Sequence, residues 1–336
     1  MKLLIASPIG LQDIGGPATV ARELSRVYEE HGDDVRVITP SWFEKRLPIG
    51  VRQLVLFIRA IPTVRWADAV LLLDPVSTGL AVAPLARLLK KRSVLRVGGD
   101  FLWEMHANRV REPIRLSEFY AMPRVLTLRE HLIHEATRFT LAFVDHIAFT
   151  TAWQERIWME PYNLSGRSTS VVESGVPEPM EAATTDTSSK VFLAASRGPY
   201  LKNGDLLAEL WPNIQMRHPE AELDTTPRPP EAYRQALAAS YALILPSISD
   251  VCPNAVLEAI AYGKPFITTK DTGLYELYPE SGMFVDTRDP NEIVAAIEKL
   301  LDPAGYRDAV ARMRSSRRRR TWEDAAAEFR TLLAVP

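Results

Sequence analysis

Residues 2–40 read KLLIASPIGLQDIGGPATVARELSRVYEEHGDDVRVITP, and this stretch decides the fold. An almost continuous apolar run at 2–9 is typical of a strand that is covered on both faces of its sheet. The glycine pair and the proline at 15–17 predict a helix that reaches about residue 31, because proline suits the first turn of a helix. A second apolar run at 34–40 predicts the next strand. Strand, helix and strand in this order indicate a parallel α/β sheet.

The same alternation runs along the rest of the chain and stops once. Strand-like apolar runs follow at 67–75, 93–100, 146–150 and 171–176. Residues 178–189, EPMEAATTDTSS, are small and polar without any periodicity, which predicts a linker. The alternation then restarts, with strands expected at 191–195, 241–246, 265–269 and 283–286. We therefore expect an N-terminal domain at 1–175, a linker at 176–189, a C-terminal domain at 190–320 and a helix at 321–336 that returns to the first domain.

Composition agrees with this division and excludes several classes of protein. A chain of 336 residues fits two domains, and 46% apolar residues exclude global disorder. The net charge of −2 argues against a dedicated nucleic-acid binder, which normally carries a basic excess. A single cysteine, Cys252, cannot form an internal disulfide, so we expect a cytoplasmic location. No apolar run has the length of a membrane span, and the opening run is too short for a signal peptide.

Two candidate binding elements follow strands of the first half, at the edge where doubly wound sheets bind ligands. Gly15 and Gly16 follow the first strand, where glycines let an anion approach a helix start; the alternative is a simple tight turn. Asp100 ends a strand after two glycines and is a candidate polar contact, or else the N-cap of the next helix. Neither element is a dinucleotide fingerprint, since no G-x-G-x-x-G is present.

Further candidates follow the strands of the second half. Arg197 and Lys202 come after the strand at 191–195, and two cations there suit a diphosphate; the alternative is a solvated loop. Asp250 follows the strand at 241–246. Glu258 lies about one turn into the next helix, where it can accept hydrogen bonds from a ribose diol or serve only as an acid near the helix dipole. Exposed amides at the start of this helix can face a phosphate or a sugar.

Two other patterns contain residue types that are found at metal sites and at membrane surfaces. HLIHE at 131–135 contains metal-ligating residue types, but the order H-x-x-H-E matches no zinc motif, and we expect no metal site. Residues 43–65 mix apolar residues with five cations, which could rest on an anionic membrane or close the acceptor side of a cleft. The basic run at 317–320 is interpreted as a solvated segment, with an anionic membrane as the alternative.

Together these stretches resemble the family 4 glycosyltransferases, which are retaining enzymes of GT-B fold. Residues 245–273, LPSISDVCPNAVLEAIAYGKPFITTKDTG, resemble the E-x7-E segment of that family and the E-A-x-A-x-G-x-P that follows it. ASRGPYLKNGD at 195–205 resembles its G-R-x-x-x-x-K element. The opening 40 residues, VVESGV at 171–176 and TWEDAAAEFRTLL at 321–333 also look like family elements, so the resemblance covers nearly the whole chain.

The chain departs from the family pattern in three places. Asp250 stands where the first glutamate is usual, and Gly99 and Asp100 stand where a histidine is common. Between residues 222 and 242 the chain appears shorter by about one strand–helix unit, in a region that helps to enclose the nucleotide base. We therefore expect a shortened C-terminal domain.

The resemblance implies two Rossmann-like domains that face a central cleft, and transfer of a hexose with retention of configuration. The donor would be a UDP-sugar or GDP-sugar and the acceptor a hydroxyl of a glycan, a lipid or a small molecule, with no metal and no resident cofactor. The implied contacts are Arg197, Lys202, Gly15 and Gly16 for the diphosphate, Glu258 for the ribose, Asp250 with the amides of Asn254 and Ala255 for the sugar, and Asp100 for the acceptor or the donor sugar. Of these, Asp100, Arg197, Lys202 and Asp250 are the predicted catalytic residues. Two alternatives stay open: a non-catalytic nucleotide-sugar-binding or scaffold protein, and a sugar-nucleotide epimerase of the same fold.

Overall fold

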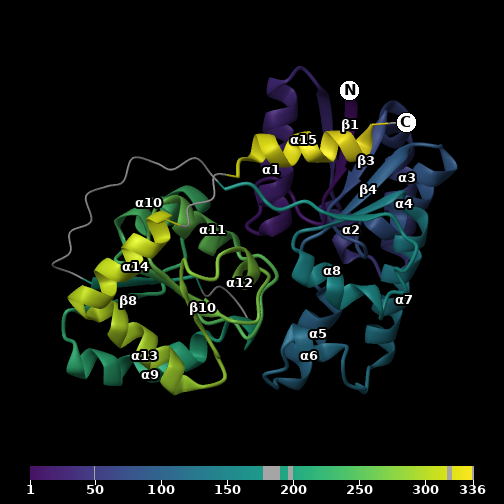
Figure 1. Cartoon of the computed structure of the whole chain (residues 1–336). Coiled ribbons are helices and arrows are strands. Elements are labelled where there is room, and N and C mark those ends of the chain that lie inside the picture. The colour runs from purple at the N-terminus through teal and green to yellow at the C-terminus, as the bar shows by residue number, and fades with distance from the viewer. Residues whose placement is uncertain (49, 177–189, 196–199, 316–319, 335–336) are drawn as a thin grey trace. The chain divides into compact units, whose positions relative to one another are not determined.

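The computed structural model describes residues 1–48, 50–176, 190–195, 200–315 and 320–334. Contacts within the chain divide it into two compact units (Figure 1). Unit 1 comprises Met1–Leu102, Val125–Gly175 and Arg320–Pro336, and unit 2 comprises Trp103–Arg124 and Val176–Arg319. The segment Trp103–Arg124 was expected in the first domain but belongs to unit 2, where its Leu116 and Ser117 N–H groups donate to Ser249 and Asp271.

Unit 1 is built on a parallel sheet with the strand order β2-β1-β3-β4-β5-β6. The strands are β1 Lys2–Ala6, β2 Asp34–Ile38, β3 Ala69–Leu72, β4 Arg92–Val97, β5 His146–Phe149 and β6 Thr169–Val171. All neighbouring pairs are parallel, and Leu3 lies opposite Val35 on one side and Ala69 on the other. The central strands β1, β3, β4 and β5 are buried on both faces, whereas the edge strands β2 and β6 are partly exposed.

Helices cover both faces of this sheet. They are α1 Gly16–Glu30, α2 Trp42–Arg46, α3 Val51–Trp66, α4 Gly79–Leu88, α7 Leu128–Phe143, α8 Ala152–Met159 and α15 Trp322–Leu333, with α5 Phe101–Val110 starting at the boundary of the unit. The helices α1 and α15 pack against each other, and Leu24 and Phe329 share a core cluster with Leu3 and Ile5 of β1. Figure 1 shows α3, α4 and α7 as a separate group, in which α3 contacts α4 and α4 contacts α7.

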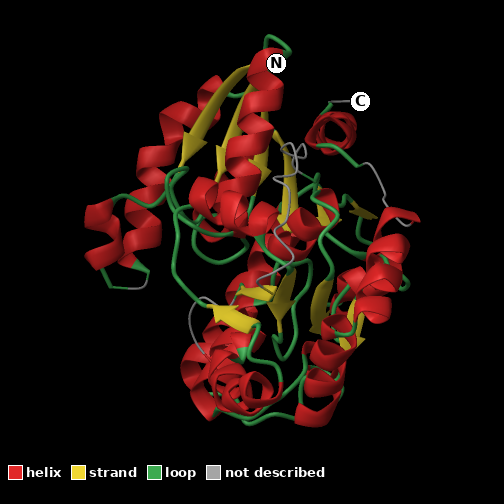
Figure 2. Ribbon diagram, turned by 90° about the vertical axis from the view of Figure 1, so that its left-hand side faces the viewer, coloured by secondary structure: helices red, strands yellow, loops and turns green. Residues whose placement is uncertain are grey.

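Unit 2 is built on a second parallel sheet with the order β11-β10-β9-β7-β8. Its strands are β7 Lys190–Ala194, β8 Ala221–Asp224, β9 Ala242–Leu245, β10 Phe266–Thr269 and β11 Met283–Val285. Its helices are α6 Leu116–Phe119, α9 Gly204–Arg217, α10 Pro230–Ala239, α11 Asn254–Ala261, α12 Leu274–Leu277, α13 Pro290–Leu301 and α14 Pro303–Ser315, with a short 3-10 helix at Tyr200–Lys202. Figure 2 shows the strands of each sheet with helices packed around them.

The core of unit 2 follows the alternation of side chains along its strands. Ile244 of β9 packs with Trp211 of α9 in one buried cluster, whereas its neighbour Leu243 packs with Ile260 of α11 in another. Two apolar clusters on opposite faces of one parallel sheet are the expected result of strands and helices in alternation. The predicted fold class, two Rossmann-like α/β domains, is therefore confirmed.

The described strands of unit 2 number one fewer than those of unit 1. Between β8 and β9 the structure contains a single helix, α10, in the stretch where the sequence was expected to be short. The edge next to β8 therefore carries no further described strand.

Candidate functional site

The strand order of unit 2 places a switch point between β7 and β9. The chain runs from β7 to β8 on one side of the sheet and then returns to β9 on the other side. Ligands of open α/β sheets bind in the crevice at the carboxyl ends of the strands, where the strand order reverses. The loops after β7 and β9 are joined at this point, because the N–H of Ile248 donates to the carbonyl oxygen of Leu201 at 2.9 Å.

Lys202 and Asp250 meet directly beside this backbone contact. The Lys202 Nζ donates a hydrogen bond to the Asp250 Oδ2 at 2.5 Å, and the two side chains are 33% and 17% exposed. Both side chains are thus partly buried but still in contact with solvent, so a ligand can reach them. Residues predicted separately, from two different loops, therefore form one charged site.

The charges of the site keep Lys202 protonated. Burial alone would lower the pKa of Lys202, but the charge and hydrogen bond of Asp250, together with the charge of Glu104, raise it above its ordinary value. Lys202 therefore carries its positive charge throughout the physiological pH range. A cation that is already desolvated and oriented attracts an anion more strongly than a fully hydrated lysine.

A buried network supports the loop that carries Asp250. The N–H of Asp250 donates to the carbonyl oxygen of Asp271 at 3.1 Å, and Asp250 bridges Thr272 in the loop after β10. The Ser249 Oγ donates to the Asp271 Oδ1 at 2.5 Å and accepts the N–H of Leu116 at 2.9 Å. The Asp271 carboxylate is buried, and Ser117 of α6 donates to it as well.

This network attaches the segment Trp103–Arg124 to the carboxyl edge of the second sheet. Sequence reasoning missed Ser117, Ser249 and Asp271. Ser249 and Asp271 lie in the loops after β9 and β10, and that position was the signal which could have identified them. Ser117 carried no comparable signal. These residues hold the loop of Asp250 and, with it, the geometry of the charged pair.

The helix α11 begins just beyond Asp250, at Asn254. Its N-cap residue is Pro253, and no side chain caps this end. The amides of Asn254 and Ala255 are therefore placed at an uncapped helix start, which favours negative charge and hydrogen-bond acceptors. Glu258 is half-buried one turn further along, and its charge adds to burial in raising the pKa of Tyr262.

Three predicted residues lie in unit 1. Gly15 is the N-cap residue of α1 and Gly16 is its first residue, so the glycine pair does open a helix after β1. A Cβ added to Gly16 would meet no atom within 4 Å, which leaves open space beside the backbone. Asp100 is 1% exposed, and its Oδ2 accepts a hydrogen bond from the Trp158 Nε1 at 2.9 Å. Asp100 is thus buried beside Trp158 at the end of β4.

Arg197 lies outside the described residues. The described residues contain no group of three or more His, Cys, Asp or Glu side chains that could hold a metal ion. Within the same ranges no helix is both long and apolar enough to cross a bilayer.

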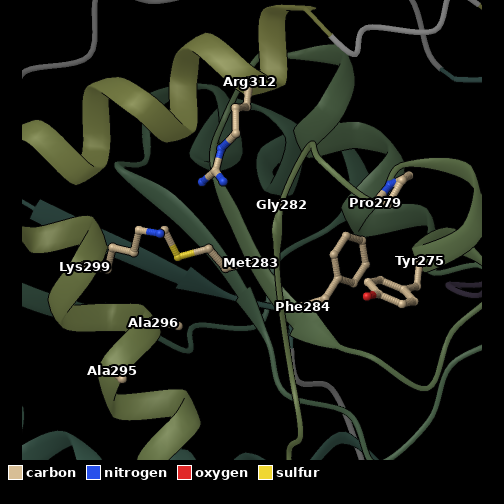
Figure 3. Close-up of a pocket in the computed structure, with 9 residues that line it drawn as sticks. All are labelled: Tyr275, Pro279, Gly282, Met283, Phe284, Ala295, Ala296, Lys299 and Arg312. Atoms are coloured by element: carbon tan, nitrogen blue, oxygen red, sulfur yellow. The ribbon is translucent and has the colours of Figure 1, made fainter.

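A pocket of about 370 Å³ lies elsewhere on unit 2, beside the edge strand β11 (Figure 3). Figure 3 shows Arg312 of α14 and Lys299 of α13 on one side, with Phe284 and Tyr275 on the other. It contains none of the predicted site residues, so the charged pair and this pocket are separate features.

Part of the second half of the chain matches known glycosyl transferases in sequence. Residues 223–303 match the family model of the group 1 glycosyl transferases. The chain is also 32% identical over 117 residues to the D-inositol 3-phosphate glycosyltransferase of Corynebacterium urealyticum, an alignment that covers 33% of this chain and 28% of that protein. The matched region therefore spans little more than a quarter of this curated relative.

Solved structures resemble the chain over nearly its whole length. The sucrose-phosphate synthase of Thermosynechococcus elongatus superposes with a TM-score of 0.68 at 15% identity, covering 98% of each chain. The Anabaena protein HepE, in a complex with UDP and glucose, gives a TM-score of 0.65 at 15% identity over the whole of both chains. At this level of identity the likeness shows a shared fold.

Proposed function

We propose that this protein is a retaining glycosyltransferase that moves a hexose from a UDP-sugar or GDP-sugar to a hydroxyl of a glycan, a lipid or a small molecule. The observation that carries the proposal is the Lys202–Asp250 pair at the switch point of unit 2. Asp250, Asn254, Ala255 and Glu258 all fall within the residues that match the glycosyl transferase family model. HepE, which shares the fold, is described with UDP and glucose, and this supports a nucleotide-sugar donor.

Lys202 is proposed to stabilise the leaving diphosphate. Negative charge develops on the diphosphate as the bond to the sugar breaks, and a preorganised cation lowers the energy of that state. In the free protein the Lys202 ammonium group donates a hydrogen bond to the Asp250 carboxylate. An incoming phosphate competes for the same protons, and Asp250 is then released to accept hydrogen bonds from the sugar hydroxyls. Arg197 is proposed as the second diphosphate cation and Gly16 as its backbone neighbour.

The start of α11 is proposed to bind the remainder of the donor. The amides of Asn254 and Ala255 would donate to sugar or phosphate oxygens, and the Glu258 carboxylate would accept both hydroxyl protons of the ribose. Asp100 would act from within unit 1 by holding the chain near the end of β4.

The reaction is proposed to need neither a metal nor a dedicated base. The acceptor hydroxyl attacks the sugar on the face that the diphosphate leaves, and a phosphate oxygen of the leaving group takes the acceptor proton. The new bond then has the configuration of the old one. The roles left to the protein are positioning and charge stabilisation, which Lys202, Asp250 and α11 supply.

The experiment that tests the proposal is a comparison of Lys202→Ala with Lys299→Ala. Loss of a hydrogen bond to a charged group costs about 1.5–3 kcal/mol, so Lys202→Ala should weaken UDP or GDP binding at least about ten-fold. Lys299 is an exposed lysine of α13 in the same unit, and its removal should leave the affinity unchanged. Calorimetric titration measures both. Equal affinities in the two variants would show that Lys202 is an ordinary surface charge.

Asp250→Asn should separate the two halves of the donor. Without the carboxylate charge, Lys202 loses its internal competitor, so UDP or GDP should bind as tightly as to the parent protein or several-fold more tightly. The affinity for the intact nucleotide sugar should not increase in this way, because the amide is a weaker acceptor for sugar hydroxyls. Parallel titrations with nucleoside diphosphate and with nucleotide sugar measure the difference. A uniform loss for both ligands would contradict the assignment of Asp250 to the sugar.

A further inference from the structure

Exposed apolar side chains gather on one helical layer of unit 1. The layer consists of α2, α3, α4 and α7, and the contacts between α3 and α4 and between α4 and α7 make it continuous (Figure 1). Its exposed large apolar residues are Trp42, Phe43, Val51, Leu54, Ile58, Leu88, Leu128, Leu132 and Phe139. Most of the large apolar side chains exposed on the described residues therefore belong to this one layer.

The exposed residues follow the period of a helix. On α3, Val51, Leu54 and Ile58 recur at intervals of three and four residues, so they share one face. The opposite face of α3 is already buried by Leu56, Ala60 and Val64. Helix α3 therefore carries apolar side chains on two faces, and only one of these faces is buried by packing within unit 1.

The second amphipathic stripe lies on α7. Leu128 is 77% exposed, and Leu132 and Phe139 continue the same face, whereas Ile133 and Leu141 are buried on the inner face. Leu88, at the end of α4 between these two helices, is exposed as well. Glu135 lies on the same face of α7 and is exposed, and Arg138 donates a hydrogen bond to its carboxylate. Large apolar side chains exposed on helices that pack against one another indicate an interaction site.

Exposed cations lie on α2 and at the end of α3, beside the apolar side chains of these two helices. Lys45 and Arg46 are exposed on α2, and the Arg46 guanidinium stacks over the Trp42 ring at 3.8 Å from its centroid. Arg65 continues the exposed face of α3 at its last turn, and α3 contains no acidic residue. Glu44, the acid of α2, is buried, and Arg59 binds it with two nitrogens.

We infer that this layer docks on an anionic lipid bilayer, with α3 and α7 lying in the plane of its surface. Apolar side chains beside tryptophan and arginine are the pattern of helices that insert at a membrane interface. Cations at the rim match the negative surface of anionic lipids. A second copy of the chain suits the surface less well, because a two-fold contact would bring two identical sets of the cations Lys45, Arg46 and Arg65 into one interface. The inference goes beyond the proposed reaction and does not depend on it.

Vesicle flotation tests the inference directly. The full-length protein should float with vesicles of phosphatidylglycerol and phosphatidylcholine, and it should stay behind with vesicles of phosphatidylcholine alone. Raising the salt concentration should weaken the binding, because exposed charges are screened. Lys45→Glu with Arg46→Glu should reduce the partition coefficient at least about five-fold per cation, since each contributes about 1 kcal/mol near an anionic surface.

Matched apolar variants distinguish insertion from simple charge attraction. Leu54→Glu with Ile58→Glu, and separately Leu132→Glu, should abolish flotation while leaving the melting temperature and nucleotide affinity unchanged. Met216→Glu is the control, because Met216 is 79% exposed on α9 of unit 2. Flotation of the apolar variants like the parent, or equal binding to both kinds of vesicle, would overturn the inference. So would light scattering that shows a dimer which these variants dissociate.

Discussion

Lys264 is a buried ammonium group in the turn between α11 and β10. It is 5% exposed, and its Nζ donates to the carbonyl oxygen of Ser240 at 2.9 Å. Burial lowers its pKa from 10.5 to about 8. The folded chain therefore releases this proton at a lower pH than the unfolded chain does. Between about pH 8 and 10.5 the unfolded state binds more protons, so the free energy of unfolding should rise with pH in that window.

Lys264→Met should remove this rise. The substitution also removes the hydrogen bond to Ser240, so the slope with pH is the informative quantity and the absolute stability is not. Urea unfolding at several values between pH 7 and 9.5 measures it. The range ends there because burial raises the pKa of Tyr28 and Tyr241, and these groups reduce stability once unfolded tyrosines ionise above about pH 10. An equal slope in Lys264→Met and the parent would show that another group controls the titration.

Which residues form the charged site was predictable only in part. Lys202 and Asp250 each follow a strand, and their positions after β7 and β9 could be predicted from the apolar runs before them. Their mutual contact could not, because it depends on the strand order that places β7 beside β9. The burial of Asp100 under Trp158 was unpredictable for the same reason: 58 residues separate the two partners.

Helix α15 shows how a distant element completes unit 1. Trp322 and Phe329 are buried against α1, and the backbone of Trp322 passes close to Gly175. A Cβ at Gly175 would lie 2.5 Å from the Trp322 N and 2.7 Å from the Thr321 carbonyl carbon. Contacts that short with backbone atoms are not relieved by a side-chain rotation.

Gly175→Ala should therefore loosen α15. We expect a loss of about 1–3 kcal/mol in the stability of unit 1, the usual cost of overpacking, and faster amide exchange throughout α15. Gly16→Ala is the control, since its Cβ meets no atom within 4 Å. Hydrogen exchange read by mass spectrometry reports on both variants. Unchanged protection of α15 in Gly175→Ala would mean that the backbone moves apart without cost.

Elements were predictable where a periodic pattern existed. The first strand and helix followed from an apolar run and a proline at a helix start, and the closing helix at Trp322 followed from the resemblance of residues 321–333 to a family element. The segment Trp103–Arg124 has no such pattern that assigns it to a unit. Its place in unit 2 depends on hydrogen bonds from Leu116 and Ser117 to residues more than a hundred positions away.

At the scale of the whole molecule, the two units share one strand arrangement but differ in the contacts of the residues that follow corresponding strands. The order β2-β1-β3 of unit 1 corresponds to β8-β7-β9 of unit 2. Asp74 follows β3 as Asp250 follows β9, but Asp74 binds the N–H groups of Ser77 and Thr78 at 2.8 Å and so closes its own loop. Asp250 instead faces Lys202. This difference supports the proposal that a nucleotide donor binds to unit 2.

The measurement that tests the central claim most directly is proton NMR of a UDP-sugar or GDP-sugar incubated with the purified protein and with Lys202→Ala. The anomeric signal reports consumption of the donor and the configuration of the product. We predict that the parent protein consumes a donor and that the sugar leaves with its configuration retained, by transfer or by slow hydrolysis. Lys202→Ala should lose this activity while Lys299→Ala keeps it. A donor that binds but is never consumed would identify a binding or scaffold protein, release of a free epimerised sugar would identify an epimerase, and either result would contradict the proposed transferase.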